Sequence, residues 1–89
     1  MDNFEQIESL FARLISIPDS ELSESERAEI SEFVDVGEYG VALHTSVWIY
    51  IEENKIPTEL EVDIVKGLAE LMKKDPEPML QRLRSIGKD

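Results

Sequence analysis

The sequence predicts an all-α protein, a compact bundle of four to five helices that forms a single domain over residues 1–89. Apolar residues recur at the 3.6-residue spacing of a helix face in successive segments. Proline and glycine residues separate these segments, as they do at the ends of helices. Two sequences of the capping-box type Ser/Thr-x-x-Glu begin helices; they are Ser23 with Glu26 and Thr58 with Glu61.

The first helix is expected over about residues 2–16. Its apolar side contains Phe4, Ile7, Leu10, Phe11, Leu14 and Ile15. Ile17 and Pro18 end it, because the residue before a proline avoids the helical region. The second helix begins at the Ser23 capping box and ends at Gly37, which suits a left-handed conformation. Its inward residues are Ile30, Phe33 and Val34.

The third segment, about residues 38–54, is apolar on most sides. Its broad apolar face contains Tyr39, Ala42, Leu43, Val47, Tyr50 and Ile51. Val41 and Trp48 lie nearly opposite that face. Helices of this kind usually lie centrally in a bundle. The β-branched residues also allow a strand over residues 47–51, but the length of the segment and its helical neighbours favour a helix.

Two more helices complete the predicted bundle. The fourth covers residues 59–74, with Leu60, Ile64, Leu68, Leu71 and Met72 pointing inward. Gly67, at the edge of that face, would permit another helix to approach closely. The fifth begins with Asp75 and Pro76 and runs to Ile86, and Gly87 ends it. Its inward residues are Met79, Leu80 and Leu83.

The negative charge is concentrated in one stretch. The chain has a net charge of -11, and residues 19–63 contain 13 acids but only two bases, Arg27 and Lys55. Such an acidic block attracts basic partners and repels nucleic acid and anionic membranes. We therefore expect a basic protein as the partner, and neither nucleic acid nor a membrane. The basic residues near the C-terminus, Lys73, Lys74, Arg82 and Arg84, are interpreted as solvated helix residues.

Few residues suit catalysis or metal binding. There is no cysteine, and the one histidine, His44, has no second histidine for a catalytic triad or a zinc site. We interpret His44 as an ordinary helix residue and predict no enzyme activity, no cofactor and no metal. No apolar run is long enough to span a membrane, and the acidic start lacks the features of a secretory signal. A cytoplasmic location is therefore expected.

The twelve residues from Glu32 to Leu43, EFVDVGEYGVAL, resemble the MafI family of immunity proteins, which is itself similar to some CdiI immunity proteins of contact-dependent inhibition systems. The matching positions are Gly37, Glu38, Tyr39, Gly40, Ala42, Leu43, Ile56 and Pro57. The resemblance covers residues 30–72, and His44 stands where many relatives carry an acid. It implies a cytoplasmic bacterial protein that binds the C-terminal domain of a cognate toxin and blocks it. Toxins of such systems are often nucleases, and an RNase is one such activity.

The leading hypothesis is an immunity protein that occludes a basic toxin domain with its acidic helices. Its predicted partner-binding residues are Glu29, Glu32, Asp35, Glu38, Tyr39, Trp48, Glu52 and Glu53. The aromatic pair could supply the buried anchors of the interface. The alternative is an acidic adaptor or regulatory interaction domain, with a homodimer through Val41 and Trp48 left open. A small acid-rich enzyme is the third and weakest hypothesis.

Overall fold

The structure, a computed structural model, describes residues 3–87 and is all-helical over that range. Its helices are α1 (Phe4–Leu14), α2 (Glu24–Asp35), α3 (Tyr39–Glu52), α4 (Glu59–Leu71) and α5 (Glu77–Arg84). The radius of gyration, 12.1 Å, equals the value of about 12 Å expected for a compact chain of this length. The predicted helical bundle is confirmed, and residues 47–51 belong to a helix rather than a strand.

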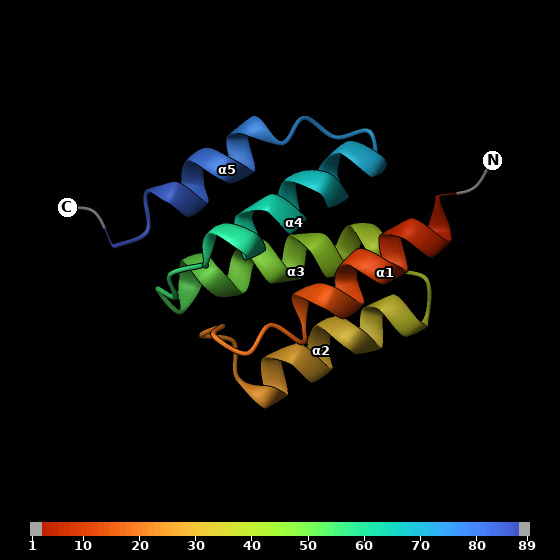
Figure 1. Ribbon diagram of the computed structural model, residues 1–89, viewed down its shortest axis with the longest axis horizontal. Coiled ribbons are helices and arrows are strands. Elements are labelled where there is room, and N and C mark those ends of the chain that lie inside the picture. The colour runs from red at the N-terminus through yellow and green to blue at the C-terminus, as the bar shows by residue number, and fades with distance from the viewer. Residues whose placement is uncertain (1–2, 88–89) are drawn as a thin grey trace.

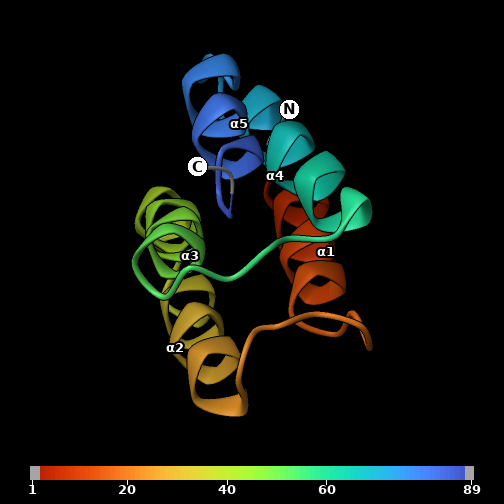
Figure 2. The same ribbon diagram turned by 90° about the vertical axis from the view of Figure 1, so that its left-hand side faces the viewer.

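The helices form two packed pairs and a fifth helix that bridges them. Helix α1 packs against α4, and α2 packs against α3. Helix α5 contacts both α3 and α4, so that it closes one side of the bundle (Figure 1). The view in Figure 2 separates the α2–α3 pair from the α1–α4 pair and places α2 and α5 on opposite sides of the molecule. Within residues 3–87, no helix combines the length and apolar character needed to cross a membrane.

Both predicted capping boxes form. Ser23 Oγ accepts from the Glu26 amide at 3.1 Å, and Glu26 Oε1 accepts from the Ser23 amide at 2.8 Å. Thr58 and Glu61 repeat the arrangement at the start of α4 with the same two distances. Each box satisfies two backbone donors that a helix N-terminus otherwise leaves unpaired.

Three helices end at a residue in the left-handed conformation. Gly37 ends α2 with φ 77°, as predicted, whereas Asn54 after α3 (φ 52°) and Lys73 after α4 (φ 61°) were not expected in this role. At each end the next amide donates to a carbonyl five residues earlier, as in a Schellman motif. These three bonds, all 2.8 Å long, join Glu38 to Phe33, Lys55 to Tyr50 and Lys74 to Ala69. Helix α4 therefore stops at Leu71, short of the predicted Lys74.

The core lies between the two helix pairs. Two residues that were predicted to face it do not. Phe4 and Leu60 were expected to face inward, but they are 53% and 45% exposed. Both lie in the first turn of a helix, and α4 is also rotated from its predicted orientation. Its buried face includes Glu61, Val65 and Ala69, because the Glu61 carboxylate finds hydrogen-bond partners inside the protein.

Gly67 allows α1 and α4 to approach closely, as predicted. A Cβ atom at this position would lie 3.3 Å from Leu10 Cδ1, which is tighter than an ordinary contact. Helix α5 starts one residue later than Pro76, which has helical backbone angles, and the Asp75 carboxylate accepts from the Glu77 amide at 3.1 Å. The helix ends two residues before the predicted Ile86, and Gly87 follows with φ 79°.

Candidate functional site

The predicted partner-binding acids all lie on the surface. Three of them, Glu29, Glu32 and Asp35, lie on one exposed side of α2 together with Glu24; we call these four residues the α2 acidic face. Small or apolar residues separate them, Ala28 within the face and Val36 at its end. Glu38 follows at the α2–α3 turn, and Glu52 and Glu53 are exposed at the end of α3.

The two bases within residues 19–63 make hydrogen bonds to other parts of the fold instead of pairing with the exposed acids. Lys55 Nζ lies 2.7 Å from Glu26 Oε1 and donates to the Glu21 carbonyl at 3.0 Å. Arg27 is partly buried and donates to the Ile17 carbonyl at 3.3 Å. Of the 13 acids in this stretch, 11 are exposed, and neither base is. The charged side chains that this stretch exposes are therefore all acidic.

The pairing of Lys55 with Glu26 also affects protonation. Burial alone would raise the pKa of Glu26, but hydrogen bonds from Lys55 and from the Ser23 amide hold that pKa below its ordinary value. Glu26 therefore keeps its charge, and with it the capping box and the ion pair, at any pH near neutral. The Glu26 side chain caps the start of α2 and pairs with Lys55, so its role within the acidic stretch is structural.

A buried acid lies at the centre of the fold. Glu61 is fully buried, and its Oε2 atom accepts from Tyr50 Oη at 2.5 Å and from Ser20 Oγ at 2.6 Å. Burial and the hydrogen bond to Glu61 raise the pKa of Tyr50. The cluster ties α3 and α4 to the connection between α1 and α2. All three side chains have hydrogen-bond partners within the protein, so we interpret the cluster as structural.

Tyr39, one of the two predicted aromatic anchors, is held by α1. Its hydroxyl donates to the Glu8 carboxylate, and this bond raises the pKa of Tyr39. Its ring lies 5.6 Å from the ring of Phe4, centre to centre. Part of its surface is therefore used within the fold. The side chain borders a shallow hollow of about 630 Å³ that also includes Phe4 and Val41.

Trp48, the other predicted anchor, lies on a different part of the surface. Its side chain is 49% exposed, and its ring stacks on His44 at a centroid distance of 6.4 Å. Trp48 lines a small cleft between α3 and α5, with Lys74 and Arg82 among the other lining residues. Helix α2 lies on the other side of α3 (Figure 2). The structure thus brings Trp48 together with cations and leaves the α2 acidic face without a tryptophan.

This grouping of Trp48 with Lys74 and Arg82 was not recognised from the sequence. Both cations were interpreted as solvated helix residues, and both are indeed exposed. Their position beside Trp48 depends on how α5 packs, which local patterns do not specify. Among residues 3–87, no three or more potential ligands are grouped so that they could hold a metal ion.

Comparison with known proteins adds no assignment. A scan of protein-family models, a search of curated proteins and a search of solved structures give no match to the chain. The functional argument therefore depends on the sequence and on the surfaces described above.

Proposed function

We propose that the protein is a non-enzymatic binding protein of the immunity type, which neutralises a toxin domain by covering a basic surface on it. The observation that carries the proposal is the acidic surface of residues 19–63, where 11 carboxylates are exposed and both bases are engaged inside the fold. A uniformly negative surface accelerates encounter with a positive partner and disfavours negative ones.

The distribution of the acids supports a macromolecular partner over an ion or a small molecule. The four carboxylates of the α2 acidic face extend along a 12-residue helix, which is about 18 Å long. A partner that meets all of them must carry basic groups spread over a similar length. Val36, at the end of this face, is 72% exposed and offers apolar contact beside the charges.

The resemblance to the MafI family supports a toxin domain as that partner. A nuclease toxin needs a cationic cleft to hold phosphate groups, and an acidic helix laid over that cleft would exclude the nucleic acid. Neutralisation by occlusion needs no chemistry from the inhibitor. This fits the exposed position of His44, which stacks on Trp48.

The proposal implies a toxin gene directly upstream of the gene for this protein, and co-expression with the toxin domain of that gene tests it. Wild-type protein should restore growth and co-purify with the toxin domain at one-to-one stoichiometry. The variant His44→Ala should protect as well as the wild type, because His44 has no proposed role in covering the basic surface. Growth arrest despite normal levels of folded protein, or protection without complex formation, would contradict stoichiometric inhibition.

A second candidate function is an adaptor domain that dimerises through α3. It is favoured by the exposure of Val41 and Trp48, at 41% and 49%, on the outer face of that helix. Sedimentation velocity over a range of concentrations separates the two functions. A stable dimer that persists at low micromolar concentration and has no affinity for the toxin domain would favour the adaptor.

A further inference from the structure

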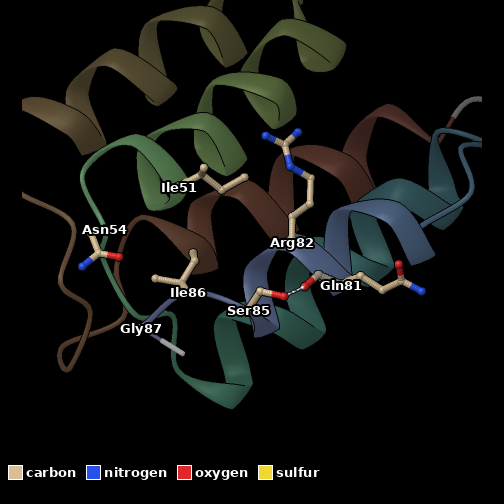
Figure 3. A pocket seen from close by; sticks show the side chains of 7 residues that line it. All are labelled: Ile51, Asn54, Gln81, Arg82, Ser85, Ile86 and Gly87. Atoms are coloured by element: carbon tan, nitrogen blue, oxygen red, sulfur yellow. Dashed lines mark hydrogen bonds between the residues drawn. The ribbon is translucent and has the colours of Figure 1, made fainter. Parts of the chain in front are cut away.

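The seam between α3 and α5 contains a groove that the proposed function does not use. It consists of a small cleft of about 110 Å³ and a wider hollow of about 610 Å³, which share Ile51 and Arg82. The cleft extends toward Gly40 and Lys74, and the hollow extends toward Asn54 and Gly87. We call the two together the α3–α5 groove. Figure 3 shows the wider hollow, in which the Arg82 side chain extends from α5 toward α3.

The lining of the groove is apolar at its base and aromatic on one wall. Leu43, Val47 and Met79 line the cleft, with Trp48 beside them. In the wider hollow, Ile51 projects from α3 and Ile86 follows α5 (Figure 3). A half-exposed tryptophan above aliphatic side chains is the kind of surface that holds an apolar side chain of a partner.

The polar groups that line the groove carry positive or no charge. Acids make up 20 of the 89 residues, yet among the described residues none lines either hollow. Lys74 and Arg82 stand beside Trp48, and within residues 3–87 the sole salt bridge is the distant pair Lys55–Glu26. The nearby Asp75 accepts from the Glu77 amide and makes no ion pair with Lys74. Within residues 3–87 the two cations therefore have no acidic partner, and they are placed to bind an anion.

We infer that the α3–α5 groove binds an acidic peptide segment of a partner protein. An apolar side chain of the segment would lie against Trp48, and a neighbouring carboxylate would meet Arg82 and Lys74. A guanidinium can bind a carboxylate through two parallel hydrogen bonds. This site is opposite in charge to the α2 acidic face and independent of it, because α2 and α5 lie on opposite sides of the molecule (Figure 2).

The dimensions favour a peptide. The 14 residues of α3 extend over about 20 Å, a length that an extended segment of about six residues spans. The residues that line the two hollows follow α3 from Gly40 to Asn54, so an extended segment of that length would contact both. A small organic anion would contact Arg82 and Trp48 but leave the hollow beyond Ile51 empty.

Selection from a phage-displayed library of random heptapeptides tests the inference. The full-length protein is the target, and Arg82→Gln is the counter-target. Enriched peptides should place Asp or Glu next to a large apolar residue. A synthetic peptide of the enriched sequence should alter the fluorescence of Trp48, which is the one tryptophan of the chain and therefore reports on the groove directly.

Calorimetric titration of that peptide gives the matched comparison. Arg82→Gln should weaken binding about 10-fold or more, because a charge-assisted hydrogen bond is lost. Arg84→Gln removes the same charge from the same helix, but Arg84 does not line the groove, so it should change affinity less than about 2-fold. Circular dichroism establishes that both variants remain folded.

Three outcomes would overturn the inference. One is a selection that enriches no peptide or enriches basic peptides. Another is equal weakening by Arg82→Gln and Arg84→Gln, which would indicate general charge attraction. The third is a shift of Trp48 fluorescence with protein concentration alone, together with a dimer in sedimentation, which would assign the groove to a second copy of the chain.

Discussion

At the level of single residues, Lys73 adopts a backbone conformation that suits glycine better. It ends α4 with φ 61° and is exposed, and a left-handed conformation costs a non-glycine residue about 1–2 kcal/mol. Lys73→Gly should therefore raise the free energy of unfolding by about 1 kcal/mol, after the greater entropy of an unfolded glycine is subtracted. Urea denaturation measures the change.

The neighbouring residue provides the control for this prediction. Lys74 is also exposed, and it is not among the residues with positive φ. Lys74→Gly should leave the stability unchanged or lower it slightly, since glycine then contributes only its entropic penalty. Equal effects of the two substitutions would mean that backbone strain at Lys73 does not limit stability.

Because the Tyr50 hydroxyl is buried against Glu61, the stability of the fold should depend on pH in the alkaline range. Burial and the hydrogen bond to Glu61 raise the pKa of Tyr50, so the folded protein keeps the proton when an unfolded tyrosine loses it near pH 10. The unfolded state then binds fewer protons than the folded state. The free energy of unfolding should accordingly fall as the pH rises above about 10, by up to about 1.4 kcal/mol per pH unit.

The substitution Tyr50→Phe separates the two contributions of this hydroxyl. At neutral pH it should lower the free energy of unfolding by about 2 kcal/mol, because a hydrogen bond to a buried carboxylate is lost. Above pH 10 it should flatten the decline in stability, which denaturation at several pH values would measure. Tyr39→Phe is the comparison, since its hydrogen bond to Glu8 is at the surface. A decline that persists unchanged in Tyr50→Phe would contradict the assignment.

At the level of helices, sequence patterns were sufficient to predict where α2 and α4 begin. Capping boxes and proline act within a few residues of the position they specify, so the starts of α2 and α4 agree with the structure. The end of α4 was missed because the left-handed residue there is Lys73, and lysine gives no signal of that conformation.

The inward face of α4 was harder to predict than its existence. A search for apolar periodicity includes Leu60 and leaves out Glu61, yet the structure exposes the leucine and buries the acid. The partners that make this possible are Tyr50 and Ser20, at 11 and 41 positions from Glu61. No local pattern reveals a buried carboxylate whose hydrogen-bond donors come from other elements.

Alanine substitutions test the orientation of these helices. Leu43 and Leu68 are fully enclosed in the core, so Leu43→Ala and Leu68→Ala should each lower the free energy of unfolding by about 2–5 kcal/mol. Leu60→Ala removes the same atoms from an exposed position and should lower it by less than about 1 kcal/mol. Thermal or urea denaturation of the three variants provides the comparison. Similar losses at Leu60 and Leu68 would show that α4 is turned differently.

The candidate site, like the helices, could be predicted only in part from the sequence. The exposed acids of α2 could be predicted, because the side of the helix that carries Ile30 must face the core and the remaining sides then face solvent. The surroundings of Trp48 could not be predicted, since Lys74 and Arg82 lie 26 and 34 positions further along the chain. Only the packing of α5 against α3 brings them together. A basic groove and an acidic face were therefore merged into one expected surface.

At the level of the whole molecule, charge is separated along the axis that joins α2 to α5. The acidic face lies on α2 at one side of the molecule, and α5 lies at the opposite side (Figure 2). On or next to α5, the exposed bases Lys74, Arg82 and Arg84 outnumber the exposed acids Asp75 and Glu77. A basic partner approaching from a distance should therefore be oriented toward the α2 side before it makes contact. Position matters here as well as total charge, and this makes the proposed interface testable with matched variants.

The double variant Glu32→Lys with Asp35→Lys should slow association with the proposed toxin partner by about 10-fold or more at low salt. It should change the dissociation rate much less, because charges at the edge of an interface act mainly on the encounter of the two proteins. Glu70→Lys with Glu77→Lys changes the net charge equally, but Glu70 lies at the end of α4 and Glu77 at the start of α5. That control should retain most of the association rate. Stopped-flow measurements at low and high salt should show the two variants converging as screening increases. If both variants slow association equally, the partner responds to net charge alone and the α2 acidic face has no special role. If neither does, the acidic surface plays no part in binding the proposed toxin partner.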